Sequence, residues 1–260
     1  MTREWNAEAY HQVSTPQATW GQRVLGRLSL AGNERVIDAG CGSGRLTGDL
    51  LDRLPHGQVL AIDRSWNMLQ TARANLRPTH AHHVRFAQVA LPALPCAGWA
   101  DVVFSTATFH WVDDHPTLFA HVLAALKPGG RLHAQYGGGP NLANAHALAT
   151  AVMREDPFVE VFADWKDLWT FTSADETTEQ LTAAGFVDVH AWLEPAPTLL
   201  ASADDYREFI ATVNYRAQVA ALPLPWQDRF LDRITTLAGQ QEEPYLLDYW
   251  RLNVTAARPA

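Results

Sequence analysis

The chain has 260 residues, a formal net charge of −8 at pH 7 and only two cysteines. The acidic balance argues against a nucleic-acid partner, and two cysteines exclude a disulfide framework as the main source of stability. No apolar run is long enough to span a bilayer, and the first residues lack the apolar region of a signal peptide. We therefore expect a cytoplasmic protein with no membrane partner.

Strands and helices alternate through the first half of the chain. A helix is expected from Thr15 to about Leu28, before the first strand. Further apolar β-type runs lie at 59–62, 84–89, 101–106 and 131–136. Helical patterns separate them at about 45–54, 65–76 and 116–126. Five strands that alternate with helices predict a parallel sheet with right-handed crossovers.

The second half of the chain is less regular. We expect a helix at about 141–154, and Ser173–Glu176 is a capping box that opens another. A strand pattern follows at 186–192, helices at 203–215 and 226–237, and a final strand at 247–257. The sequence thus predicts an α/β, Rossmann-like fold. It comprises a mostly parallel sheet of about seven strands, helices on both faces, and helical lid insertions.

The stretch Val36–Gly44 carries the strongest functional signal. An apolar strand reaches the carboxylate of Asp38, and glycines then occupy alternate positions at Gly40, Gly42 and Gly44. Glycines permit a tight turn and the close approach of a ligand to the backbone, and the next helix presents its N-terminus to that ligand. The spacing differs from the Gly-x-Gly-x-x-Gly of dinucleotide sites, and Asp38 would repel a pyrophosphate but attract a cation.

A second carboxylate narrows the choice of ligand. Asp63 ends the second strand, where it can accept hydrogen bonds from both hydroxyls of a ribose. A ligand with a ribose, an ammonium group and no phosphate satisfies both Asp38 and Asp63. S-adenosylmethionine is such a ligand.

Four motifs together resemble the class I S-adenosylmethionine-dependent methyltransferases over about residues 34–135. They are Val36–Gly44, Asp63, Asp101–Trp111 and Leu126–Leu132. Within that superfamily the chain is most similar to the trans-aconitate methyltransferase-like group, through Trp5-Asn6, Tyr10, Phe109–Trp111 and Tyr249–Leu252. The resemblance implies a methyltransferase that uses S-adenosylmethionine, releases S-adenosylhomocysteine, needs no metal and acts on a small-molecule acceptor.

The resemblance also implies how the cofactor is held. Asp38 would hold the methionine ammonium side, Asp63 the ribose hydroxyls, and Met68 would pack against the adenine. The family often has an acidic residue after the third strand, where this chain has Ala90, so one polar contact to the adenine is missing. The predicted cofactor-binding residues are Tyr10, Asp38, Ala39, Gly40, Cys41, Gly42, Gly44, Asp63, Arg64, Met68, Ala90, Leu91, Ser105, Thr106 and His110.

The sequence says less about the acceptor and about the residues that bind it. A carboxylate acceptor needs no base, whereas a hydroxyl or a carbon acid does. His110 is the candidate catalytic base, with a packing or orienting role beside the cofactor as the alternative. Arg251 can receive an acceptor carboxylate or form a surface or lid ion pair. The predicted substrate-binding residues are Tyr10, Trp111, Tyr136, Trp165 and Arg251.

We therefore expect methyl transfer to a carboxylate or hydroxyl oxygen of a small molecule, by a monomer or a homodimer. A non-catalytic adenosyl-binding module and transfer to carbon or nitrogen are the alternatives. Cys41 is expected to fill space in the turn, and His80, His82 and His83 to lie on a solvated loop without a metal. The expected parts are a helical cap (1–33), a cofactor-binding core (34–136), a lid insertion (137–172), a core continuation (173–193), a helical lid (194–246) and a final core strand (247–260).

Overall fold

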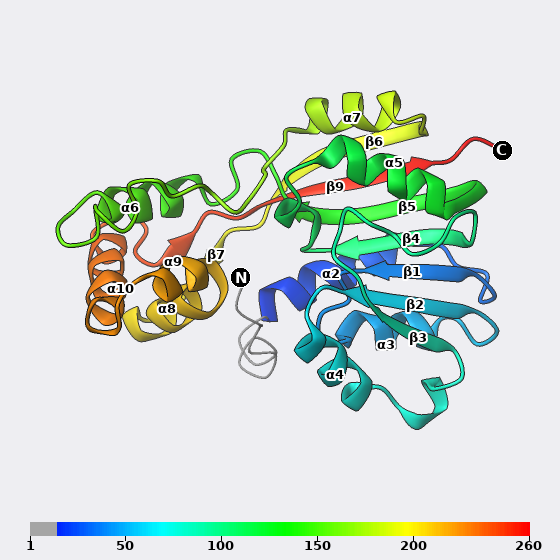
Figure 1. Cartoon of the computed structure of the whole chain (residues 1–260), viewed down its shortest axis with the longest axis horizontal. Coiled ribbons are helices and arrows are strands. Elements are labelled where there is room, and N and C mark those ends of the chain that lie inside the picture. Colours follow the sequence, from blue (N-terminus) through cyan, green and yellow to red (C-terminus); the bar gives the residue numbers. More distant parts are fainter. Residues whose placement is uncertain (1–14) are drawn as a thin grey trace.

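A seven-stranded sheet lies at the centre of the larger part of the molecule (Figure 1). The computed structural model describes the backbone of residues 15–260 and the side chains from residue 19 onward. The strand order is β3-β2-β1-β4-β5-β9-β6, and β9 alone runs against the others. The strands are β1 (Arg35–Ala39), β2 (Gln58–Asp63), β3 (Val84–Gln88), β4 (Ala100–Thr106), β5 (Leu126–Gly137), β6 (Val187–Pro195) and β9 (Trp250–Ala257). The predicted Rossmann-like, mostly parallel sheet is confirmed.

Helices cover both faces of this sheet (Figure 1). On one face, α5 (His115–Ala125) and α7 (Ala174–Ala183) enclose a core that includes Phe119 and Leu181, both fully buried. The other face is covered by α2 (Thr15–Arg27), α3 (Arg45–Asp52) and α4 (Trp66–Asn75). The short turns η1 (Pro78–His80) and η2 (Phe109–Trp111) follow α4 and β4. Each helix buries its apolar stripe against the sheet, as the sequence periodicity requires.

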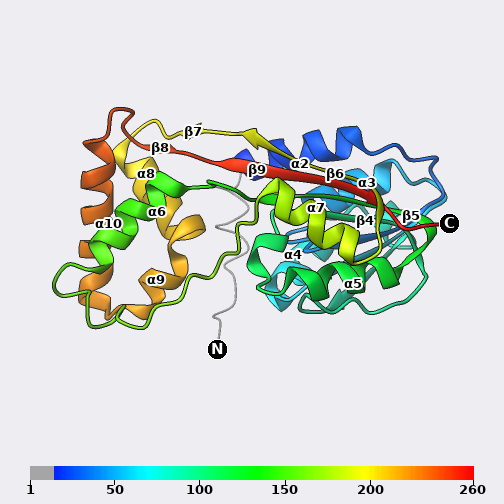
Figure 2. The same ribbon diagram turned by 90° about the horizontal axis from the view of Figure 1, so that it is seen from above.

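A separate helical body lies beyond one end of the sheet (Figures 1 and 2). It is built from α6 (Ala143–Met153), α8 (Ala203–Phe209), η3 (Ile210–Asn214), α9 (Arg216–Ala221) and α10 (Leu224–Gly239). These elements share their own apolar core, which Trp20 of α2 joins through an edge contact with Tyr249 at 5.0 Å between ring centroids. The helical body is therefore packed against the sheet domain through α2.

Two predicted elements are interrupted. The last strand is not continuous from 247, because β8 (Leu246–Leu247) pairs with β7 (Thr198–Leu199) and β9 begins only at Trp250. Between them, Asp248 accepts the N–H groups of Asn144 and Ala145 at 2.9 and 3.3 Å, which satisfies free donors at the start of α6. The helix predicted at 203–215 changes to a wider π turn after α8.

Local capping signals in the sequence are confirmed. Of the three histidines expected on a solvated loop, His82 is exposed, His83 is half-buried and His80 is not solvated. Ser65 accepts from the Met68 N–H at the start of α4, and Ser173 accepts from the Glu176 N–H at the start of α7. His80 is buried and lies 3.0 Å from Asp52. No helix among residues 15–260 is long and apolar enough to cross a membrane.

Candidate functional site

The glycine turn joins the carboxyl end of β1 to α3. Gly40, Gly42 and Gly44 have φ angles of 82°, 53° and 81°, in the left-handed region that favours glycine. The N–H groups of Gly40 and Cys41 both donate to the Ile62 carbonyl of β2, at 2.8 and 3.0 Å. The turn is thus held against the neighbouring strand.

The three glycines have different surroundings. A Cβ on Gly40 would overlap the Thr108 side chain, and one on Gly44 would lie 2.8 Å from the Ala72 Cβ. A Cβ on Gly42 would meet no atom within 4 Å. Gly40 and Gly44 are therefore required by the protein's own packing. Gly42 lies against open space, where a ligand can approach the backbone.

Asp38 is a buried carboxylate beside this turn. Its side chain is 3% exposed, and its Oδ2 accepts from the Thr47 hydroxyl at 2.7 Å. Burial raises the pKa of Asp38 to about 7, the charge of Asp63 adds to this rise, and the Thr47 bond opposes it. A positively charged ligand group would stabilise the ionised carboxylate here.

Asp63 is held at the end of β2 by two backbone donors. Its Oδ2 accepts from the Gly42 N–H at 3.0 Å, and its Oδ1 accepts from the Ser65 N–H at 2.8 Å. Each carboxylate oxygen has more than one acceptor position, so ligand hydroxyls can still bind. Asp63 thus holds the Gly42 N–H and acts electrostatically on Asp38, and Met68 is buried in the first turn of α4.

The remaining residues that were predicted to bind the cofactor lie in different surroundings, some buried and some exposed. The Ser105 hydroxyl is buried and donates to the Ala39 carbonyl at 2.7 Å, which ties β4 to β1. Ala90 is exposed, and its carbonyl accepts from the Ala93 N–H in a turn. Tyr10 lies outside the described residues. The other positions are as follows: Arg64 follows the end of β2, Leu91 is half-buried against the main core, and Thr106 ends β4.

Cys41 is not a reactive thiol. Burial raises its pKa well above the ordinary value, and the carboxylates of Asp38 and Asp63 raise it further. A nucleophilic cysteine needs the opposite shift. Its 9% exposure and its place in an apolar cluster agree with the predicted space-filling role.

His110 lies in η2, beyond the end of β4. Its Nδ1 accepts a hydrogen bond from the Gly137 N–H at 3.2 Å, and its carbonyl accepts from the Thr170 N–H at 2.9 Å. A backbone N–H can only donate, so Nδ1 is the unprotonated nitrogen and Nε2 carries the proton. Burial lowers the pKa of His110 well below its ordinary value, and the charge of Arg251 lowers it further. His110 is therefore a neutral imidazole that presents an N–H donor.

Arg251 is a buried cation near His110. It is 4% exposed, and its guanidinium lies 4.7 Å from the centre of the Trp20 ring. In the antiparallel register of β5 and β9 it stands opposite Gly137. Its burial excludes the surface ion pair among the roles expected for it.

The predicted pocket wall is only partly brought together. Trp111 contacts the His110 ring at 5.3 Å and Trp169 at 5.8 Å. Tyr136 is instead 1% exposed within the main core, where its ring packs against Phe109 and His115, so it lines no open surface. Trp165 packs edge-on against Phe162 in the core of the helical body.

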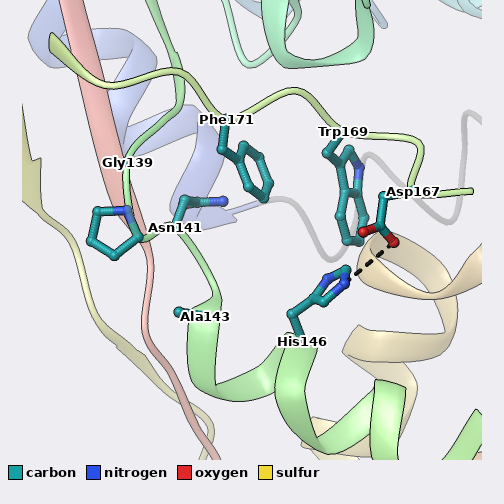
Figure 3. Close-up of a pocket in the computed structure, with 8 residues that line it drawn as sticks. Gly139, Asn141, Ala143, His146, Asp167, Trp169 and Phe171 are labelled. Carbon is teal, nitrogen blue, oxygen red and sulfur yellow. Dashed lines mark ion pairs between the residues drawn. The ribbon is translucent and has the colours of Figure 1, made fainter. Parts of the chain in front are cut away.

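A pocket of about 250 Å³ lies between the end of β5 and the start of α6 (Figure 3). Trp169 and Phe171 stack at 5.8 Å on one side of it, and the His146 Nε2 lies 3.3 Å from an Asp167 oxygen on another. Asn141 extends into the pocket from the loop after β5. The sequence analysis singled out none of these residues for a site.

Two further missed residues lie on the cofactor side. Thr47 holds Asp38, and Thr108 covers Gly40. Thr47 lies one helical turn after Gly44, so a hydroxyl near Asp38 was a detectable signal. The described residues contain no group of three or more His, Cys, Asp or Glu side chains placed to hold a metal.

Comparison with known proteins identifies the chain. The family described as a methyltransferase domain matches residues 36–130. The chain is 29% identical over 234 residues to a trans-aconitate 2-methyltransferase of Deinococcus radiodurans, which covers 88% of this chain and 87% of the relative. It is also 29% identical over 262 residues to a trans-aconitate 2-methyltransferase of Methylobacterium nodulans, with 98% of each covered. The chain is an S-adenosylmethionine-dependent methyltransferase.

Solved structures confirm the fold of this methyltransferase. A phosphoethanolamine N-methyltransferase of Haemonchus contortus, in complex with S-adenosyl-L-methionine, matches with a TM-score of 0.62 at 17% identity, over 98% of this chain and 57% of that one. An S-adenosylmethionine-dependent methyltransferase from Mesorhizobium loti matches with a TM-score of 0.55 at 22% identity, over 93% and 98%. The glycine turn and His110 of the methyltransferase lie within the matched family segment, whereas Gly137, Asn141 and Arg251 lie beyond it.

Alanine substitutions should distinguish the glycine that a ligand approaches from the glycine that the protein's own packing requires in the glycine turn of the methyltransferase. We expect Gly42→Ala to abolish most S-adenosylhomocysteine binding and to lose only the stability that a side chain at positive φ costs, because its Cβ enters open space. Gly44→Ala should lower the free energy of unfolding by at least ~1 kcal/mol more than Gly42→Ala does, because its Cβ meets Ala72. Calorimetric titration and urea unfolding measure the two effects.

Gly98→Ala is the matched control. Gly98 has a φ of 57°, close to the 53° of Gly42, and a Cβ there also meets no atom within 4 Å. The Gly98→Ala variant therefore introduces the same backbone strain at a position outside the glycine turn. It should bind S-adenosylhomocysteine like the wild type. Wild-type affinity in Gly42→Ala would contradict the assignment of Gly42 to the cofactor.

Proposed function

We propose that this methyltransferase methylates a carboxylate oxygen of a small organic acid. The observation that carries the proposal is the hydrogen bond from the Gly137 N–H to His110 Nδ1. It leaves His110 with a protonated Nε2, which can donate to an anionic oxygen but cannot remove a proton from an acceptor. A carboxylate is ionised at neutral pH and needs no base, whereas a hydroxyl or a carbon acid does.

The cofactor side fits S-adenosylmethionine, which supplies a methyl group already activated by its sulfonium charge. We assign Asp38 to the positively charged methionine end, because a buried carboxylate gains most from a nearby cation. Asp63 is assigned to the ribose hydroxyls. Gly42 leaves the backbone open for close approach. These residues hold the ligand in place and exclude water, which is what an in-line transfer requires of the protein.

The acceptor side needs only donors and positive charge. The carboxylate oxygen uses its own lone pair to form the O–C bond, the S–C bond breaks with its electrons remaining on sulfur, and no proton is transferred. Arg251 and the His110 Nε2–H would attract the acid before the reaction. The ester product is neutral, so the same groups hold it less strongly and it can leave.

The relatives support an acid as the acceptor, since the two described above are named trans-aconitate 2-methyltransferases. The position of the helical body supports a small acceptor acid. It contributes His146 of α6, and the segment leading back from it to the sheet contributes Trp169, so the pocket lies between the two parts of the molecule. We assign this body the role of a lid over the acceptor.

A panel of small carboxylic acids tests the proposal. Release of S-adenosylhomocysteine should accompany a product that alkali hydrolyses to the acid and methanol, as an ester requires. With S-adenosylmethionine saturating at every pH, turnover should stay level between about pH 6 and 9, because acids of this class are ionised above about pH 5 and His110 does not titrate in that range. An alkali-stable product, or a rate that rises with a pKa near about 6.5, would contradict a base-free transfer to oxygen.

Asp38 should make cofactor binding depend on pH. Its pKa of about 7 means that below this value a proton must leave before the carboxylate can pair with a cation. S-adenosylmethionine affinity should therefore rise between about pH 5.5 and 8, by up to about tenfold per pH unit below pH 7, with release of a proton. The raised pKa also means that the unliganded protein loses stability as pH rises from 3.8, the ordinary pKa of an aspartate, to about 7.

Calorimetry in two buffers of different ionisation enthalpy measures the released proton directly. Asp38→Asn should bind more weakly at pH 8 and should lose the pH dependence. Wild-type affinity that is constant over this range, with no proton released, would exclude Asp38 as the partner of the cationic end.

A further inference from the structure

Two side chains that line the pocket, Asn141 and Phe171, and the neighbouring imidazole of His110 converge on Gly137, the last residue of β5. Its N–H donates to His110 Nδ1. A Cβ at this position would lie 2.7 Å from Asn141 Nδ2 and 2.8 Å from Phe171 Cε1. The absence of a side chain here is therefore what allows an amide, an aromatic ring and an imidazole to meet at one point.

The orientation of the Asn141 amide is fixed by the backbone. The Trp250 N–H donates to Asn141 Oδ1 at 2.9 Å, and a backbone N–H can be satisfied only by the oxygen of the amide. The other terminal atom of the amide, which lies beside Gly137, is consequently the NH₂ nitrogen. Asn141 is 4% exposed, and within the described part of the chain no acceptor takes a hydrogen bond from its Nδ2. Nδ2 is not among the fully buried unpaired atoms of the described residues, so this donor is accessible and can bind an acceptor on a ligand.

The pocket into which Asn141 extends is small and flat-walled (Figure 3). Its volume of about 250 Å³ lies below the range typical of drug-sized ligands. The stacked rings of Trp169 and Phe171 form one wall, with an interplanar angle of 18°. Such a wall suits a planar unsaturated body, which can lie against the rings over its whole face.

The two ends of the pocket differ in electrostatic character. At the Gly137 end the Asn141 NH₂ is a donor, and the His110 ring with its protonated Nε2 lies beside the lining residue Phe171, 6.0 Å between ring centroids, which suits one carboxylate. At the other end stands the carboxylate of Asp167, and the described residues that line the pocket include no lysine or arginine. A second acceptor carboxylate at that end would be repelled by Asp167, and the His146 imidazole there already lies 3.3 Å from Asp167.

We propose that Asn141 is a specificity-determining residue that donates to the acceptor carboxylate, and that the preferred acceptor is a small planar monocarboxylic acid rather than a polycarboxylate. The inference rests on the proposed transfer to a carboxylate oxygen and adds the class of acid to it. Asn141 and His110 hold the carboxylate, Trp169 and Phe171 hold the planar body, and Asp167 excludes a distal negative charge.

Three acids serve as probes of the S-adenosylhomocysteine-loaded protein. Cinnamate is a planar monocarboxylate, 4-carboxycinnamate adds one carboxylate at its far end, and trans-aconitate is a planar tricarboxylate. Cinnamate should bind at least about tenfold more tightly than either of the others, the size of effect expected from one uncompensated charge. Tighter binding of trans-aconitate or of 4-carboxycinnamate would overturn the inference.

Asn141→Asp is the informative variant. It keeps an oxygen for the Trp250 N–H but replaces the donor with a negative oxygen, so cinnamate binding should fall by about tenfold or more. Asn144→Asp makes the same change in charge at an exposed position nearby and should leave binding unchanged. Unchanged S-adenosylhomocysteine affinity in both variants shows that the fold is intact. Equal cinnamate affinity in the two variants would overturn the role of Asn141.

Incubation with S-adenosylmethionine distinguishes this inference from the function on which it rests. If cinnamate binds as expected and no acid in the panel yields a methyl ester, the pocket assignment stands and transfer to a carboxylate fails. If trans-aconitate is esterified in preference to cinnamate, transfer to a carboxylate stands and the proposed acceptor class fails.

Discussion

The hydrogen bond from the Gly137 N–H to His110 Nδ1 is the constraint on which the acceptor site depends. It links the turn after β4 to the end of β5, and it selects the tautomer in which Nε2 is a donor. Burial and the nearby guanidinium of Arg251 keep this imidazole neutral. A site built in this way presents donors to the acceptor and no base, which favours an acceptor that is already an anion.

The cofactor side has the opposite electrostatic character. Asp63 accepts from the Gly42 N–H and its charge acts on Asp38, and desolvation makes Asp38 costly to ionise without a cation nearby. Thr108 connects the two sides, because it covers Gly40 and lies two residues before His110. In the function we propose, the carboxyl edge of the sheet offers carboxylates to a cationic ligand next to donors for an anionic one, and the methyl group is transferred between the two.

The sheet and the glycine turn could be predicted because their signals are local. The alternation of strands and helices, the positive-φ glycines and the caps at Ser65 and Ser173 each depend on residues close in sequence. The roles of Asn141 and Thr108 could not be predicted, because they depend on contacts with residues that are distant in sequence, Trp250 and Gly40. Tyr136 was expected in the pocket wall and lies in the core, since strand alternation tells which residues share a face but not which face covers the ligand.

The protonation of His110 tests the central claim most directly. Nitrogen-15 NMR of the imidazole, with S-adenosylhomocysteine bound, reports which ring nitrogen carries the proton. The account predicts a protonated Nε2 and a bare Nδ1 at about pH 7, with no change down to about pH 6. A protonated Nδ1 with a bare Nε2, or an imidazolium that forms near pH 6.5, would contradict it, because His110 would then be able to act as a base.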